Sequence, residues 1–209
     1  MTSHSYAVSG HTNMRSPYTF IILEKPEQLD LVYRSLIHLF ELSSGDNAIL
    51  GFENSFTEQD LQAYRRSLND QLASGSIRIL TAQTSKHDVI LSCILKQNNQ
   101  TTTRHVADLQ KGFIHPDYRG TGVFNEAMYH IANYAIQRQI DLFTLDVRED
   151  SPAHRLWSKI GFITFGILPD YCRYRGRSYR GHYMHMQAKD LWNKFKYASE
   201  AAGALAVLS

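Results

Sequence analysis

Apolar and polar positions in this 209-residue chain follow two repeating patterns, one typical of helices and one typical of β-strands. Between Leu29 and Phe40, apolar residues recur every three or four positions, which predicts a helix with one buried face that starts near Pro26. Thr57 supplies a capping side chain, and Asp60 an acidic first turn, for a second helix that extends to about Ala73. Two consecutive helices are therefore expected after a first short strand.

The rest of the chain alternates between short apolar runs and further helical patterns. The apolar runs predict strands at residues 18–23, 78–84, 89–97, 105–114, 142–147, 162–168 and 179–187. Helices are predicted from Val123, from Pro152 to just before Gly161, and from about Asp190. The order β-α-α-β-β-β-α-β-α-β-β, followed by a C-terminal helix, predicts an α/β fold (α+β, with a mixed sheet) flanked by helices.

Composition and charge are those of an ordinary globular protein, with 43% hydrophobic and 20% charged residues. Residues 1–17 are polar and lack periodicity, so we expect a flexible tail followed by a single domain over residues 18–209. The net charge of +2 is too small to favour nucleic acid, and no apolar run approaches the length of a membrane span. No secretion signal is evident, and Cys93 and Cys172 form no metal or disulfide framework. These features predict a cytoplasmic protein without a metal.

The most informative motif is Phe113 to Phe124, with the sequence FIHPDYRGTGVF. A strand leads through a turn and a basic, glycine-containing loop directly into a helix. Gly120 and Gly122 let the backbone approach a ligand, and the helix N-terminus adds N–H groups and a favourable dipole. This arrangement suits a pyrophosphate, although it lacks the third glycine of a dinucleotide fingerprint and the Gly-Lys-Ser/Thr end of a P-loop. An ordinary glycine-rich turn before a helix is the alternative interpretation.

This loop resembles the acyl-CoA loop of GCN5-related N-acetyltransferases (GNAT family). The family pattern Arg-x-x-Gly-x-Gly/Ala is matched by Arg119 and Gly122, and the preceding His115-Pro-Asp-Tyr118 matches as well. Phe124 stands where the pattern has a small residue, so its side chain either crowds the pyrophosphate or turns into the core.

A second match to the same family lies after the strand at 142–147. Its motif, Asn-x-x-Ala-x-x-Leu-Tyr and then Gly-Phe, is matched by Ala153, Leu156, Gly161 and Phe162. Asp150 replaces the Asn, and Trp157 replaces the Tyr. The segment 166–171 is similar to a subset of small-molecule acetyltransferases that includes tabtoxin-resistance-like enzymes. The matched region covers roughly residues 105–188, and the N-terminal half matches only in element order.

The resemblance implies a mostly antiparallel central sheet and acetyl-CoA as the co-substrate. Backbone N–H groups of the loop would bind the pyrophosphate, from Arg119, Gly120, Thr121, Gly122, Val123 and Phe124. Phe113 and Ile114 would pair their backbone with the pantetheine arm as if it were an added strand. Both side chains also suit the core of a strand.

A general base must remove a proton from the attacking amine, and two carboxylates are candidates. Asp108 aligns with a Glu that many family members carry, and alternation counted from Ile114 puts Asp108, Gln110 and Gly112 on one face. Asp146 matches an Asp of the tabtoxin-resistance-like subset. Each could instead be a hydrogen-bonded structural carboxylate, and His105 and His154 are further candidates.

The acid that would protonate the departing thiolate is not evident, because the Trp157 indole only donates a hydrogen bond. A thiol with a pKa of about 8.5 is a fair leaving group without help. Another hydroxyl could serve instead, from Tyr171, Tyr174 or Tyr183. The third alternative is a protein that binds acyl-CoA and catalyses weakly or not at all.

Residues 173–180, RYRGRSYR, interleave four arginines with two tyrosines. They fit a solvated hairpin, the mouth of a site for an anionic substrate, or a surface for single-stranded nucleic acid. The last helix, with Leu191, Trp192 and Phe195, packs on the domain or on a second subunit, so a homodimer is a further possibility.

Together these features predict an acetyl-CoA-dependent N-acetyltransferase that acts on a small-molecule primary amine, with Asp146, Asp108, Tyr171 and Trp157 as the catalytic candidates. The alternatives are a protein N-acetyltransferase and a catalytically weakened acyl-CoA-binding module.

Overall fold

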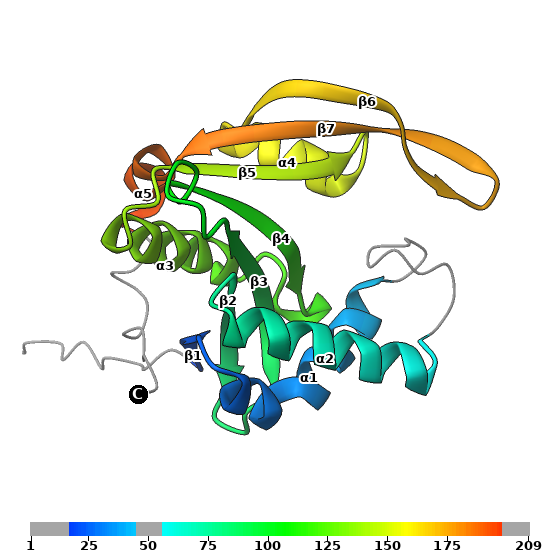
Figure 1. Cartoon of the computed structure of the whole chain (residues 1–209), viewed down its shortest axis with the longest axis vertical. Coiled ribbons are helices and arrows are strands. Elements are labelled where there is room, and N and C mark those ends of the chain that lie inside the picture. Colours follow the sequence, from blue (N-terminus) through cyan, green and yellow to red (C-terminus); the bar gives the residue numbers. More distant parts are fainter. Residues whose placement is uncertain (1–16, 45–55, 198–209) are drawn as a thin grey trace, which may run out of the picture.

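A computed structural model describes residues 17–44 and 56–197 of the chain (Figure 1). The strands are β1 (Tyr18–Leu23), β2 (Ile77–Thr84), β3 (Val89–Gln97), β4 (Val106–Ile114), β5 (Leu142–Arg148), β6 (Ile163–Tyr174) and β7 (Arg177–Gln187). The helices are α1 (Pro26–Ser44), α2 (Glu58–Ala73), α3 (Val123–Gln137), α4 (Pro152–Ile160) and α5 (Ala188–Phe195), with a short 3-10 turn at Pro116–Tyr118. The predicted order of elements and the α/β fold class are confirmed.

Local signals in the sequence set several of the helix ends. Thr57 caps α2 by accepting from the Asp60 N–H, and the Asp60 carboxylate accepts in return from the Thr57 N–H, which makes a capping box. Ser151 caps α4 by accepting from the His154 N–H, with Pro152 in the first turn. Gly161 ends α4 at φ 116°, a conformation that favours glycine. These caps account for the accuracy of the predicted boundaries.

The seven strands form one sheet in the order β1-β2-β3-β4-β5-β7-β6. Neighbouring strands are antiparallel except β4 and β5, which run parallel. A parallel pair needs a crossover, and α3 supplies it. The carboxyl ends of β4 and β5 therefore lie at the same edge of the sheet, where the glycine-containing loop begins.

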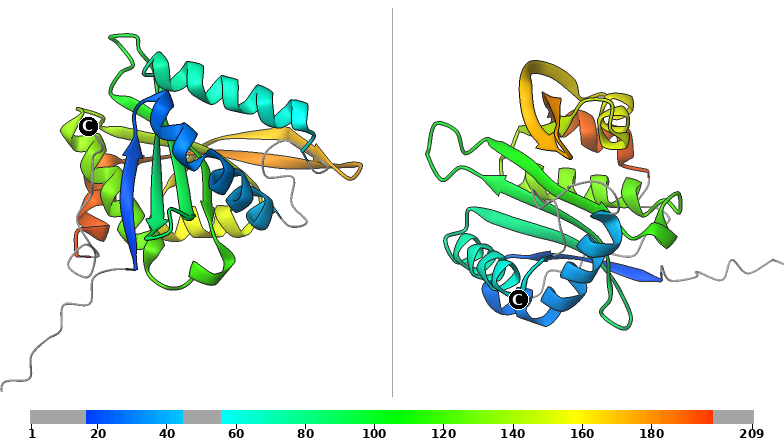
Figure 2. Two further views of the ribbon diagram at one scale, coloured as in Figure 1. Left: turned by 90° about the horizontal axis from the view of Figure 1, so that it is seen from below. Right: turned by 90° about the vertical axis from the view of Figure 1, so that its right-hand side faces the viewer.

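Two hydrophobic cores lie on opposite faces of the sheet, and Figure 2 shows helices on both of these faces. One includes Phe143 and Ile131 and lies under α3, α4 and α5. The other includes Phe40 and Leu72 and lies under α1 and α2. We call these faces the α3 face and the α1–α2 face. Most apolar side chains of β2 and β3 are buried because both of their faces are covered.

A β-bulge in β4 moves its side chains from one face to the other. Lys111 has φ 50°, and between Ile94 and Ser92 of β3 the paired residue of β4 moves from Gln110 to Phe113. Leu109 consequently packs in the α3 core and Phe113 in the α1–α2 core, although their numbers differ by four. Ile114 packs against the α3 core. The predicted alternation, which was counted back from Ile114, is therefore wrong across the bulge. Asp108 and Gln110 lie on the same face of β4, but Ile114 lies on the opposite face.

The last hairpin is longer than predicted. Its strands were expected at 162–168 and 179–187, but β6 continues to Tyr174 and β7 begins at Arg177. Arg175 and Gly176 make the turn, both with positive φ, as a tight two-residue hairpin requires. The dense arginines obscured this turn in the sequence. Most of the predicted tail at 1–17, and most of the segment between the first two helices, lie outside the described residues.

Phe143→Ala should lower the free energy of unfolding by about 3–5 kcal/mol, because this ring is fully buried at the centre of the α3 core. Phe165→Ala is the matched control, since that ring is 62% exposed on β6 and should cost less than about 1 kcal/mol. Urea denaturation of the two variants measures both values, and equal losses would contradict the assigned core.

Candidate active site

The parallel strands β4 and β5 separate shortly after they begin. Only Val106–Asp108 pairs with Leu142–Thr144, and no ladder joins the later residues of these two strands. β4 continues to pair with β3 as far as Ile114, and β5 with β7 as far as Arg148. Each strand therefore presents an unpaired backbone edge to the other, and Figure 1 shows β4 bending away from β5. An extended ligand could pair with the edge that includes Phe113 and Ile114.

The glycine-containing loop lies directly beyond the end of β4. Gly120 has φ 77°, and Gly122 has φ 97° at the N-cap of α3. A Cβ added at either glycine would meet no atom within 4 Å, so the space beside both is open. Their N–H groups donate to no backbone carbonyl among the described residues. This loop has the open space and the N–H donors that an anionic group needs.

Phe124 turns away from the loop and into the α3 face. Its ring makes edge-on contacts with Trp157 of α4, at 6.0 Å between centroids, and with Phe195 of α5, at 6.3 Å. Trp157 also packs on Phe162, at 5.0 Å. The bulky residue therefore leaves the loop clear, and Trp157 belongs to an aromatic cluster with it.

Asp108 is half-buried and held on both carboxylate oxygens. It accepts hydrogen bonds from Thr144 Oγ1 at 2.9 Å and from Gln110 Nε2 at 2.7 Å. Burial raises the pKa of Asp108 and outweighs these two donors, which act in the opposite direction. The negative charge of Asp146 adds a smaller increase to that pKa. Asp108 is therefore a half-buried carboxylate whose two oxygens each already accept from a side-chain donor.

Asp146 lies on the same face of β5 as Thr144, but it is exposed. Its carboxylate accepts a hydrogen bond from the Tyr171 hydroxyl, across from β6. Burial and this carboxylate together raise the pKa of Tyr171, so the phenol stays protonated well beyond neutral pH. Tyr183 is the register partner of Asp146 on β7, and its ring lies 6.5 Å from that of Tyr171. The structure thus brings Asp146 and Tyr171 together with a second tyrosine beside them.

Lys111 is a charged residue near this group that the sequence analysis did not single out. It occupies the bulge of β4 and is half-buried. Desolvation lowers the pKa of its ammonium, and the charge of Asp146 partly opposes that change. The Lys111-Gly112 interruption of an otherwise apolar alternation is the signal that could have revealed the bulge.

The remaining candidates lie elsewhere. His105 directly precedes β4, and its carbonyl accepts from the backbone N–H groups of Asp141 and Leu142. His154 stacks on His182 at 4.2 Å, on the α3 face of the sheet. Tyr174 is buried next to the hairpin turn. None of the three is brought to the Asp146–Tyr171 pair.

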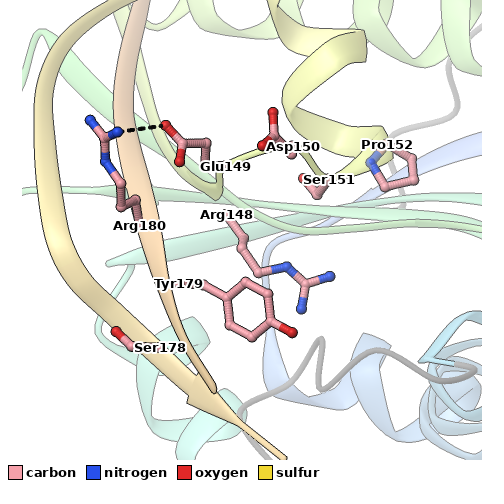
Figure 3. Close-up of a pocket in the computed structure, with 8 residues that line it drawn as sticks. All are labelled: Arg148, Glu149, Asp150, Ser151, Pro152, Ser178, Tyr179 and Arg180. Atoms are coloured by element: carbon pink, nitrogen blue, oxygen red, sulfur yellow. Dashed lines mark ion pairs between the residues drawn. The ribbon is translucent and has the colours of Figure 1, made fainter.

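Three of the four arginines of residues 173–180 have separate contacts along the hairpin. Arg173 pairs with Asp170, Arg175 lies 5.1 Å over the Tyr174 ring, and Arg180 pairs with Glu149 at 3.4 Å. In this part of the molecule a hollow of about 360 Å³ lies between the hairpin and the start of α4 (Figure 3). Its lining residues are Arg148, Glu149, Asp150, Ser151, Pro152, Ser178, Tyr179 and Arg180.

Within residues 17–44 and 56–197, no group of three or more His, Cys, Asp or Glu side chains could hold a metal ion. None of the described helices combines the length and the apolarity that a membrane crossing needs.

Comparisons with known proteins identify a family for this chain and structures with a similar fold. The model of the acetyltransferase (GNAT) family matches residues 48–162, more than half of the chain. A chimera of the spermidine N-acetyltransferase SpeG from Vibrio cholerae and hSSAT has a similar fold, with 17% identity and a TM-score of 0.62 over 85% of this chain and 99% of that one. The yncA protein of Salmonella typhimurium, solved with its cofactor acetyl-CoA, is 12% identical with a TM-score of 0.61, over 83% and 95% of the two chains.

Asp146→Asn should lower the pKa of Tyr171 while leaving it above that of an ordinary tyrosine. The carboxylate stabilises the protonated phenol through the hydrogen bond, whereas the contribution of burial remains in the variant. Ultraviolet difference titration measures this pKa when each protein is compared with its own Tyr171→Phe version, which removes the signals of the other tyrosines. An unchanged pKa in Asp146→Asn would contradict the hydrogen bond.

Proposed function

The chain belongs to the acetyltransferase (GNAT) family, whose members use acetyl-CoA, and we propose that it transfers the acetyl group to the primary amine of a small molecule. The main support for this proposal is the separation of β4 from β5, because the glycine-containing loop follows the end of β4 and Asp146 lies on β5. If acetyl-CoA lies between the two strands, its pyrophosphate would be at Gly120–Gly122 and its acetyl group near the carboxylates.

The residues present fit this co-substrate. Gly120 and Gly122 leave the open space and the N–H donors that a pyrophosphate needs. The unpaired edge of β4 offers backbone groups to the amides of the pantetheine arm, and its N–H donors could also stabilise the developing oxyanion. Both features are parts of the backbone, so Phe124 and Trp157 do not impair them.

Asp146 is the better base of the two candidate carboxylates. Its side chain is exposed and has an oxygen available besides the one that accepts from Tyr171, whereas both oxygens of Asp108 have donors. An amine arrives at neutral pH as an ammonium and must lose a proton before it attacks. Asp146 would hold this ammonium and receive the proton, directly or through water.

Tyr171 is the general acid in this proposal. The family motif has a tyrosine at position 157, but this chain has Trp157, which carries no hydroxyl. As the new N–C bond forms and the C–S bond breaks, the thiolate receives the phenolic proton, and Asp146 returns to Tyr171 the proton taken from the amine. The hydrogen bond between the two side chains permits this relay without an accumulated phenolate, which the raised pKa of Tyr171 would oppose. The nitrogen of the ammonium loses two protons in all: one reaches the thiolate by this relay, and the other leaves the acetylated nitrogen for solvent, so both side chains end in their starting states.

Acetyl-CoA should bind the intact protein with micromolar affinity, and Gly122→Trp should abolish binding, because the indole would fill the open space beside the loop. Gly176→Trp is the matched control: Gly176 also has a positive φ and open space, but it lies in the hairpin turn. Isothermal titration calorimetry measures both. Loss of binding in both variants, or in neither, would contradict the assigned loop.

Gly181→Ala should lower kcat about 10²-fold, the loss expected when an acid or base is misplaced. Tyr171 lies across Gly181, and a Cβ there would stand 2.6 Å from Tyr171 Cβ and closer still to the ring, so the tyrosine must move away from Asp146. Gly166→Ala is the control on the neighbouring strand, where the nearest atom is 3.9 Å away.

Release of CoA thiol measures the rate, and calorimetry verifies that acetyl-CoA still binds. A Gly181→Ala variant as active as the wild type would remove Tyr171 from the mechanism.

A further inference from the structure

The face of the sheet opposite the α3 core is covered by helices over only part of its width. The buried members of the α1–α2 core come from β1, β2, β3, β4 and the two helices themselves. Figure 1 shows α1 and α2 at the far end of the sheet from β6 and β7. The part formed by β5, β7 and β6 is therefore open, and it bears the Asp146–Tyr171 pair.

Four large apolar side chains are exposed on this open part. Met184 of β7 is buried in the α3 core, so its neighbours Tyr183 and His185 point to the opposite face. Paired residues of neighbouring strands share a face, and Ile163 of β6 pairs with His185. The same argument applies to the other residues of β6. The four side chains, which are between 37% and 63% exposed, are Ile163, Phe165, Leu168 and Tyr183.

Three aromatic rings on this face form a row that begins at the proposed catalytic pair. Tyr171, whose hydroxyl donates to Asp146, has its ring 6.5 Å from that of Tyr183. The Tyr183 ring lies 6.3 Å from that of Phe165. We call Tyr171, Tyr183 and Phe165 the aromatic strip. Neighbouring strands are about 4.8 Å apart, so Phe165, two strands from Asp146, lies about 10 Å from it across the sheet.

The exposure of the aromatic strip indicates a binding surface. Single exposed apolar residues are common on proteins, whereas a contiguous group beside a reactive pair marks a place where an apolar group binds. Ile163 and Leu168 extend the apolar surface at its two ends. A ligand that covers these side chains removes their area from water, and this favours an apolar group over a charged one.

We propose that the acceptor carries an uncharged apolar group, the size of an aromatic ring, in addition to its amine, and that Phe165 and Tyr183 bind this group. The inference rests on the proposed function and specifies its substrate class: a hydrophobic monoamine of the arylalkylamine type, with a short aliphatic spacer. When the ammonium lies at Asp146, the spacer crosses β7 and the ring lies against the two aromatic side chains, where edge-on contacts are favourable. A diamine of the same length would place its second ammonium on this apolar surface.

Matched amines test the inference. Phenylpropylamine is compared with propylamine, and the diamine cadaverine with pentylamine. With kcat/KM measured by thiol release, the phenyl group should raise the value by at least about tenfold, mainly through KM, because the ring leaves water on binding. The second ammonium of cadaverine should make it a poorer acceptor than pentylamine.

Phe165→Ala should lower the ratio of kcat/KM for phenylpropylamine to that for propylamine at least about fivefold, the effect of losing one ring contact. Phe165→Leu should restore part of the ratio, since it returns apolar area. A ratio taken within one variant cancels the difference in basicity between the two amines.

Ile167→Ala is the matched control. Ile167 is 45% exposed on the same strand, but it pairs with His182 on the α3 face, so its loss should leave the ratio unchanged. Calorimetry should show unaltered acetyl-CoA binding in all three variants.

Three results would overturn the aromatic strip as an acceptor site and leave the N-acetyltransferase function standing. They are equal kcat/KM values for phenylpropylamine and propylamine, a ratio that Phe165→Ala does not change, and a cadaverine rate above that of pentylamine. A wild-type dimer that Phe165→Ala dissociates in analytical ultracentrifugation would also overturn it, because a second copy would then cover the strip. Bound acetyl-CoA without transfer to any of these amines would overturn both the strip and the proposed function.

Discussion

The separation of β4 from β5 is the feature on which the rest of the site depends. Two neighbouring parallel strands normally satisfy each other's backbone groups along their length. Here the ladder ends after Asp108 and Thr144, and the remaining edges stay unpaired inside a sheet that is otherwise continuous. Such edges need a partner, and a ligand with amide groups of its own is a chemically suitable one. The gap between the strands also separates the glycine-containing loop from the carboxylate on β5.

The bulge at Lys111 accompanies this separation and has two structural effects. It bends β4 away from β5, as bulges increase local twist and curvature. It also exchanges the faces of the strand, so that Phe113 anchors the end of β4 in the α1–α2 core while Leu109 remains in the α3 core. The positive φ of Lys111 is unfavourable by itself, and the packing of both flanking residues maintains it.

The carboxylates of the site illustrate how environment assigns roles to identical groups. Asp108 and Asp146 both project to the face opposite the α3 core, from neighbouring strands. One is half-buried with two side-chain donors, and the other is exposed with a single tyrosine hydroxyl. The first helps to hold β4 to β5 through Thr144, at the last position before the strands separate. The second remains accessible to a substrate, which supports its proposed place in catalysis.

Much of this protein could be predicted from residues that are close together in the sequence. Element order, helix caps and the glycine-containing loop depend on local patterns and on the conformations that Gly122, Ser151 and Gly161 favour. The two family motifs are likewise continuous segments, and they led to the same family that the comparison identified. The catalytic candidates were also named, but as several alternatives.

Tertiary structure decided what local patterns could not. The pairing of Tyr171 with Asp146 joins residues that are 25 positions apart, and it depends on the register of β5, β6 and β7. The turn of Phe124 toward Trp157 depends on where α3 and α4 pack. The bulge at Lys111 interrupts the alternation of side chains along β4, so counting from Ile114 assigns Asp108 and Gln110 to the wrong face of the sheet. The sequence by itself determined which segments form and which chemistry they carry, because these properties are local. Which side chains meet was determined by strand register and packing, because these arise only when distant segments share one sheet and two cores.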